Sequence, residues 1–133
     1  MKLWGSALIF AATPLWAESV APVVPSGLSY AAQEVLFEPS GAYDAARKVV
    51  RLRFVAPELA DPEAFGFAAI EADFQALCDA VGVATVAKFA PNARQIIISV
   101  AAEPVQFGDS APSVVKYFDL FQVENGTCIW EGL

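Results

Sequence analysis

Histidine is absent from this sequence of 133 residues. Histidine is the commonest general base, a usual ligand of zinc and a member of the serine hydrolase triad, so its absence argues against all three kinds of site. Glycine-rich phosphate-binding loops are absent too, because the 8 glycines are scattered and form neither G-x-x-x-x-G-K nor G-x-G-x-x-G. The sequence therefore predicts no catalytic residue, no cofactor or cofactor-binding residue and no metal ligand.

Basic residues are few: Lys and Arg together number 8, against 15 Asp and Glu, and the formal net charge is −7. Proteins that bind nucleic acid or anionic lipid neutralise phosphates with Lys and Arg. We therefore expect no nucleic-acid partner and no general affinity for anionic membranes. An acidic surface favours solubility but identifies no partner.

Long apolar runs are absent except at the N-terminus. Lys2 precedes the mainly apolar residues 3–13, and residues 14–17 end in the small residue Ala17. This order of charge, apolar core and small residue predicts a signal peptide over residues 1–17, because the run is shorter than the roughly 20 residues of a transmembrane helix. A buried N-terminal helix or strand is the alternative. We expect export, with no integral membrane segment after cleavage.

A single α+β domain is predicted for residues 30–133, after an extended leader of residues 18–29. Alternating apolar and polar residues, or runs rich in Ile and Val, predict about five strands. These are Tyr30–Glu38, Arg47–Val55, Gln95–Ala101, Lys116–Glu124 and Thr127–Glu131. One helix lies between the second and third strands, so the order is β-β-α-β-β-β, which favours a largely antiparallel sheet with the helix on one face. The third strand is apolar on nearly both sides and is expected at the centre.

The helix is predicted between Asp61 and Gly82. Asp61 is a favourable N-cap, Pro62 suits the first helical position and Gly82 is typical of a helix end. Apolar residues recur every three or four positions and form one face of this helix. They are Phe67, Ile70, Phe74, Leu77, Cys78 and Val81. Cys78 is therefore expected to point into the core, while residues 83–93 and 103–113 are expected to be irregular.

Asn125-Gly126 predicts a two-residue hairpin turn between the last two strands. Opposed residues of a hairpin share one sheet face, and the faces alternate along each strand. The predicted pairs are Glu124 with Thr127, Val123 with Cys128, and Phe121 with Trp130. Cys128 is therefore expected on the face that receives the helix, and Trp130 in the core beside Phe121.

The two cysteines are expected to pair as a Cys78–Cys128 disulfide. Export brings the chain to an oxidising compartment, and the helix and the hairpin independently turn their cysteines inward. A redox-active or metal-binding pair is an alternative, but the chain has no C-x-x-C spacing and no histidine. Free buried thiols are the remaining alternative.

Arg47, Arg51 and Arg53 form the only concentrated basic feature, on one face of the second strand. They are candidates for binding an acidic partner, a carboxylate or a phosphate. Pairing with Glu34 and Glu38 of the neighbouring strand is the structural alternative.

Phe107 lies in an expected loop and is a second candidate partner-binding residue. Folding of this ring back onto the sheet is an equally good interpretation. Carboxylates could also act alone in catalysis, as in glycosidases. Glu71 and Asp73, however, diverge on a helix and are expected to lie on its solvated side.

Five short motifs of the sequence occur together in a known family. They are Gln33-Glu34-Val35-Leu36, Glu71-Ala72-Asp73-Phe74 leading to Leu77-Cys78, Gln95-Ile96-Ile97-Ile98-Ser99, residues 105–108, and residues 124–132. Through them the chain resembles the DUF6497 family, small exported proteins of unknown function from alphaproteobacteria. The resemblance implies a periplasmic location and both cysteines as family features, without an established activity or site.

Three functions are compatible with these features. The main hypothesis is a non-enzymatic periplasmic module that binds another protein, since the chain combines a compact domain with no catalytic constellation. A small hydrolase that uses carboxylates is the second, and it requires a cleft holding two of them. A carrier of a small apolar ligand is the third, and it requires a sizeable internal pocket.

Overall fold

The computed structural model describes residues 22–132. The predicted signal peptide and the first residues of the leader lie outside this range. The strands are β1 Ala31–Glu38, β2 Val49–Val55, β3 Gln95–Ala101, β4 Lys116–Glu124 and β5 Thr127–Trp130, and the helical segments are α1 Phe67–Leu77, a π-helical turn Cys78–Gly82, and α2 Val83–Phe89. Short 3-10 turns at Asp44–Ala46 and Pro57–Ala60 complete the secondary structure of this part of the chain.

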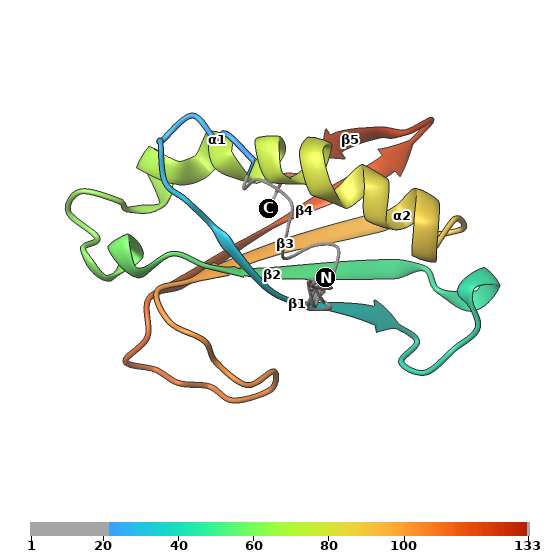
Figure 1. The fold of residues 1–133 in the computed structure, drawn as a ribbon, viewed down its shortest axis with the longest axis horizontal. Helices are drawn as coiled ribbons and strands as arrows, with labels where there is room; N and C mark the ends of the chain where they lie inside the picture. Colours follow the sequence, from blue (N-terminus) through green and yellow to red (C-terminus); the bar gives the residue numbers. More distant parts are fainter. Residues whose placement is uncertain (1–21, 133) are drawn as a thin grey trace, which may run out of the picture.

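The five strands form one sheet in the order β1-β2-β3-β4-β5. Only β2 and β3 are parallel to one another; the other neighbours are antiparallel. The helix lies between β2 and β3 in the chain and covers one face of the sheet (Figure 1). The predicted fold class is confirmed, and so is the central position of β3, whose bounds agree with the prediction.

The predicted ends of the helix are wrong. The helix begins at Phe67 and continues without a break through the π-helical turn to Phe89. Asp61 caps a separate short turn, because its Oδ1 accepts the backbone N–H groups of Glu63 and Ala64 at 3.2 and 3.4 Å. Residues 83–89, which were expected to be irregular, are therefore helical.

The helix ends where Pro91 requires it to end. The residue before a proline is disfavoured in helical conformation, and Ala90 accordingly adopts φ −150° and ψ 62°. Gly82 keeps helical angles of φ −61° and ψ −50°. Close packing explains why this residue has no side chain. A Cβ there would lie 3.0 Å from Cδ1 of Ile96 and 3.3 Å from Sγ of Cys78. Gly82 therefore lets the helix approach the sheet closely beside the disulfide.

The core lies between the helix and the covered face of the sheet. Its helical residues are buried at spacings of three and four, and its strand residues come from alternate positions, as both periodicities require. The helix contributes Ile70, Phe74, Leu77, Cys78 and Val86, and the strands contribute Val50, Leu52, Phe54, Ile96, Ile98, Val100, Phe121 and Cys128. Val24 and Leu28 of the leader, and Tyr30 directly after it, are buried in the same core.

The disulfide joins this helix to the C-terminal hairpin. Cys78 and Cys128 are bonded, with their Cα atoms 6.2 Å apart. The predicted hairpin register is confirmed, including the Val123–Cys128 pair. Asn125 and Gly126 both have positive φ, 51° and 73°, as the type I′ turn of an Asn-Gly hairpin requires.

Trp130 departs from its predicted place in the core. It faces Phe121 in the register, but it lies on the edge strand and its side chain is 54% exposed. Its indole Nε1 donates to both carboxylate oxygens of Asp119 at 3.0 Å. In the described part of the chain, residues 22–132, no helix has the length and hydrophobicity needed to span a bilayer.

Candidate functional site on the uncovered face of the sheet

The face of the sheet opposite the helix, hereafter the open face, carries the candidate site. Its side chains alternate with the core positions along each strand. Phe118 on β4 and Ile129 on β5 belong to this face and are 53% and 43% exposed. Large apolar side chains at this level of exposure on one face are typical of an interaction surface.

Cross-strand pairing arranges the open face in rows. In the central row, Arg51 of β2 is opposite Ile97 of β3, which is opposite Leu120 of β4. Glu131 extends this row beyond β5, since its backbone N–H donates to the carbonyl oxygen of Leu120 at 3.1 Å. From β2 to Glu131, the row therefore has a cation, two apolar residues and an anion, and Leu36 of β1 continues it beyond Arg51.

The adjacent row of the open face is uncharged from β2 to β5, and Glu38 of β1 continues it beyond Val49. It contains Val49 of β2, Gln95 of β3, Gln122 of β4 and Ile129 of β5. The two carboxamides lie side by side at its centre, and an apolar residue lies on each side of them.

Residues 102–115, the β3–β4 loop, pass beneath the β1–β2 side of the open face (Figure 1). The carbonyl oxygen of Val105 accepts from Nη2 of Arg53 at 2.7 Å and from Nε2 of Gln33 at 3.0 Å. The base of the loop is held by Lys116, whose Nζ donates to the carbonyl oxygens of Ser110 and Ala111. The loop is thus attached to the sheet at two points.

Phe107 lies over two of the three predicted arginines. Its ring centroid is 5.2 Å from Cζ of Arg51 and 5.5 Å from Cζ of Arg53, within the range of cation–π attraction. The ring is 53% exposed, so it both covers the arginines and presents a surface to solvent. The structure therefore brings Arg51, Arg53 and Phe107 together on the open face.

Arg47 does not belong to this group, contrary to the predicted row of three. It precedes β2, and its guanidinium lies 4.1 Å from the ring centroid of Phe37 and donates to the carbonyl oxygen of Phe89 at 2.9 Å. Phe37 pairs with Val50, whose side chain faces the helix. Arg47 therefore binds the C-terminal end of α2, where a cation is stabilised by the unpaired helix carbonyls.

Arg51 and Arg53 differ in how fully they are bonded. Arg53 is buried and pairs with Glu34 in addition to its bond to the loop. The closest carboxylate to Arg51 is that of Glu38, at 3.7 Å, and its buried Nε has no hydrogen-bond partner among the described residues. The expected pairing with Glu34 and Glu38 is thus present, but it leaves Nε of Arg51 without a partner among the described residues.

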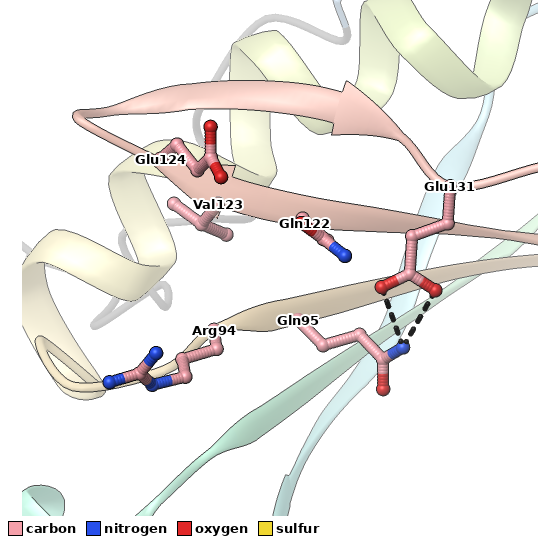
Figure 2. Close-up of a pocket in the computed structure, with 6 residues that line it drawn as sticks. All are labelled: Arg94, Gln95, Gln122, Val123, Glu124 and Glu131. Atoms are coloured by element: carbon pink, nitrogen blue, oxygen red, sulfur yellow. Dashed lines mark hydrogen bonds between the residues drawn. The ribbon is translucent and has the colours of Figure 1, made fainter.

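A pocket of about 250 Å³ lies where β3 begins and the β4–β5 hairpin ends. It is lined by Arg94, Gln95, Gln122, Val123, Glu124 and Glu131. Figure 2 shows Gln95 and Glu131 pointing toward one another, with Nε2 of Gln95 donating to both carboxylate oxygens at 3.2 and 3.1 Å, while the guanidinium of Arg94 points away from them. The carboxylate of Glu131 is thus held in place by a neutral amide.

The predicted position of Asp73 is wrong. Asp73 lies inside the protein rather than on a solvated helix face. It is 1% exposed and accepts three hydrogen bonds from Ser26 and Tyr30. The donors are the backbone N–H of Ser26 at 2.9 Å, the hydroxyl of Ser26 at 2.5 Å and the hydroxyl of Tyr30 at 2.9 Å. Burial, and then the hydrogen bond to Asp73, raise the pKa of Tyr30 far above its usual value of 10.0. Asp73 therefore attaches the leader to the helix.

The sequence patterns also missed several residues of the open face. Phe118, Gln122, Ile129 and Glu131 were not singled out, although the alternation around Phe121 and Cys128 places them on the face opposite the core. Strand alternation was therefore the signal that could have identified these residues as a surface. To use it, one has to assume that only one face of the sheet is covered.

The family model described as a family of unknown function, DUF6497, matches residues 7–133. The chain belongs to the DUF6497 family. No curated protein and no solved structure is significantly similar to it. Family membership agrees with the resemblance carried by the sequence motifs, and it brings no assigned activity.

We expect the β3–β4 loop to detach from the sheet when Arg53 loses its hydrogen bonds. Arg53→Met keeps most of the aliphatic length but removes the donors to Val105 and Glu34, and a hydrogen bond to a charged group contributes about 1.5–3 kcal/mol. Protease cleavage within residues 102–115 should therefore accelerate at least about tenfold. Arg94→Met, at an exposed arginine away from the loop, is the matched control. Equal cleavage rates in the two variants would show that Arg53 does not hold the loop.

Proposed function

We propose that this protein is an exported, non-enzymatic interaction module that binds a protein through the open face of its sheet. The observation that carries the proposal is the exposure of Phe118 and Ile129 on this face, next to the half-exposed ring of Phe107. Aromatic and aliphatic side chains surrounded by polar groups are the usual anchors of protein interfaces.

The arrangement of the carboxylates supports an interaction module over a hydrolase. Asp73 and Asp119 are the two buried carboxylates of the described chain, and each is bonded within the fold. Asp73 binds Ser26 and Tyr30, and Asp119 binds the indole of Trp130. Neither is therefore available as an acid or base for a substrate.

The packing of the core supports the same choice against a carrier of an apolar ligand. Between the helix and the sheet, Ile70, Phe74, Ile96 and Ile98 are at most 1% exposed. A carrier needs an internal cavity between such layers. Phe118 and Ile129 are instead exposed on the outside of the sheet, where they favour contact with a macromolecule.

Export is the second part of the proposal. The Cys78–Cys128 disulfide supports it, because disulfides form and persist in oxidising compartments. The N-terminal sequence pattern of residues 1–17 supports it independently. Together they favour the periplasm as the place where the open face meets its partner.

Site-specific photo-crosslinking in intact cells tests the proposed function. A photoreactive amino acid at position 118 or 129 should give a discrete covalent adduct. The same residue at position 71 is the control, since Glu71 is exposed on the helix, away from the open face. Strong adducts from position 71 together with none from 118 and 129 would contradict binding through the open face.

A further inference from the structure

We propose that the partner on the open face is a second copy of this chain, which packs sheet against sheet across a twofold axis. The inference rests on the proposed function and specifies its partner. The axis runs parallel to the strands, midway between β3 and β4. This rotation places β2 of one copy over β5 of the other, and β3 over β4. Two stacked sheets of this kind lie about 10 Å apart, with their strands nearly aligned.

The charges of the central row support this symmetry. Arg51 and Glu131 are three positions apart in the row, about 14 Å if three strand spacings separate them. The twofold rotation brings Arg51 of each copy over Glu131 of the other. Arg51 is 3.7 Å from the carboxylate of Glu38, and Glu131 is bound by the neutral amide of Gln95. Within residues 22–132, Glu131 therefore has no ion pair and Arg51 has only the long one with Glu38, and both gain a new ion-pair partner in the dimer.

The uncharged positions match under the same rotation. Ile97 meets Leu120 of the second copy at the centre. In the adjacent row Val49 meets Ile129, and Gln95 meets Gln122. Apolar residues thus face apolar residues, and carboxamides, which can donate and accept at once, face carboxamides. A twofold interface must be self-complementary in this way, because one patch serves both copies.

The shortness of β5 leaves room for the loop. β5 ends at Trp130, whereas β4 begins farther along at Lys116, so within residues 22–132 no outer strand lies beside Phe118. The β3–β4 loop, which is bonded to Arg53 through the carbonyl oxygen of Val105, lies above this gap in the other copy. Phe107 and Phe118 of different copies then approach each other. The loop that obstructs part of the open face thus faces a part of the second copy where the described residues add no strand beside β4.

Sedimentation of the oxidised protein, with its leader, tests the proposal. We expect a monomer–dimer equilibrium in the micromolar range, because the face is small compared with interfaces of permanent dimers. Arg51→Glu and Glu131→Arg should each weaken dimerisation at least about tenfold, since like charges then face each other. An equimolar mixture of the two variants should restore dimerisation, because every charge again faces its opposite.

Controls separate the possible outcomes. Glu71→Arg and Lys88→Glu change the charge of the exposed helix surface and should leave the equilibrium unchanged. Unaltered circular dichroism and disulfide content show that the variants are folded. A protein that remains monomeric, or a mixture of variants that does not associate, would overturn the twofold dimer. If position 118 then still crosslinks to a different protein, the interaction module stands and only its partner is wrong.

Discussion

Loss of the Cys78–Cys128 disulfide should lower the free energy of unfolding by about 4 kcal/mol. The bond closes a segment with a sequence separation of 50 residues, and a covalent link across such a loop restricts the unfolded chain strongly. Both cysteines are buried, at 0% and 4% exposure, in the core between the helix and the sheet. The effect is large because typical domains have only about 5–15 kcal/mol of stability.

Urea unfolding of the oxidised and the reduced protein measures this effect. The double variant Cys78→Ala and Cys128→Ala removes the bond without burying a hydroxyl, and it should resemble the reduced protein to within the cost of the lost sulfur contacts. Reductant should not change the unfolding midpoint of this variant. Equal midpoints for the oxidised and reduced natural chain would mean that the bond adds no net stability.

The C-terminal hairpin could be predicted in detail because its determinants are local. Asn125 and Gly126 tolerate positive φ, and a two-residue turn fixes every pair of the hairpin. The inward direction of Cys78 followed from helical periodicity in the same way. The disulfide prediction was correct because two local patterns had to agree on one contact.

The helix ends were missed because the sequence offers competing signals. Asp61 and Pro62 form a good helix start, but the chain uses them for an isolated turn. Gly82 resembles a helix end, yet its small size serves close packing against Ile96. Pro91 was the stronger stop signal, since it restricts the backbone of the preceding residue directly.

The open face could be predicted only in part. Strand alternation placed Arg51 and Arg53 together, and their strand pairing with Glu34 and Glu38 was foreseen as the structural alternative. The position of Phe107 over both guanidinium groups depends on how the β3–β4 loop folds back. Such a long-range contact leaves no periodic trace in the sequence, and neither does the contact of Arg47 with Phe89.

The position of Asp73 was predicted wrongly because it too depends on long-range contacts. A carboxylate on an amphipathic helix is normally solvated, and burial of a charge is costly unless its hydrogen bonds are satisfied. Ser26 and Tyr30 satisfy them from a segment that the sequence suggests is merely extended. Their involvement makes residues 22–30 part of the folded domain rather than a leader into it.

Asp73→Ala should therefore destabilise the protein by roughly 3–5 kcal/mol, by leaving the donors of Ser26 and Tyr30 buried without an acceptor. The loss should concentrate on the leader, because Val24 and Leu28 remain buried only while it stays attached. Hydrogen exchange should consequently increase at residues 22–30 more than in β3. Glu71→Ala, two positions away on the exposed helix surface, should change stability by no more than about 0.5 kcal/mol. Similar losses in the two variants would show that Asp73 is not a specific attachment point.

The pH dependence of unfolding tests the hydrogen bond between Tyr30 and Asp73. Burial and the hydrogen bond to Asp73 raise the pKa of Tyr30 in the folded protein. In the unfolded protein the same tyrosine has its usual pKa of about 10. The unfolded state therefore binds fewer protons above about pH 10, and stability falls as the pH rises beyond that value. Below about pH 10 the contribution of Tyr30 to the free energy of unfolding is complete.

Tyr30→Phe should lower the free energy of unfolding by about 1 kcal/mol at neutral pH, and this variant should lose less stability than the natural chain in alkali. Identical alkaline transitions in the two proteins would show that Tyr30 ionises freely in the folded state, and the bond to Asp73 would then not restrain it.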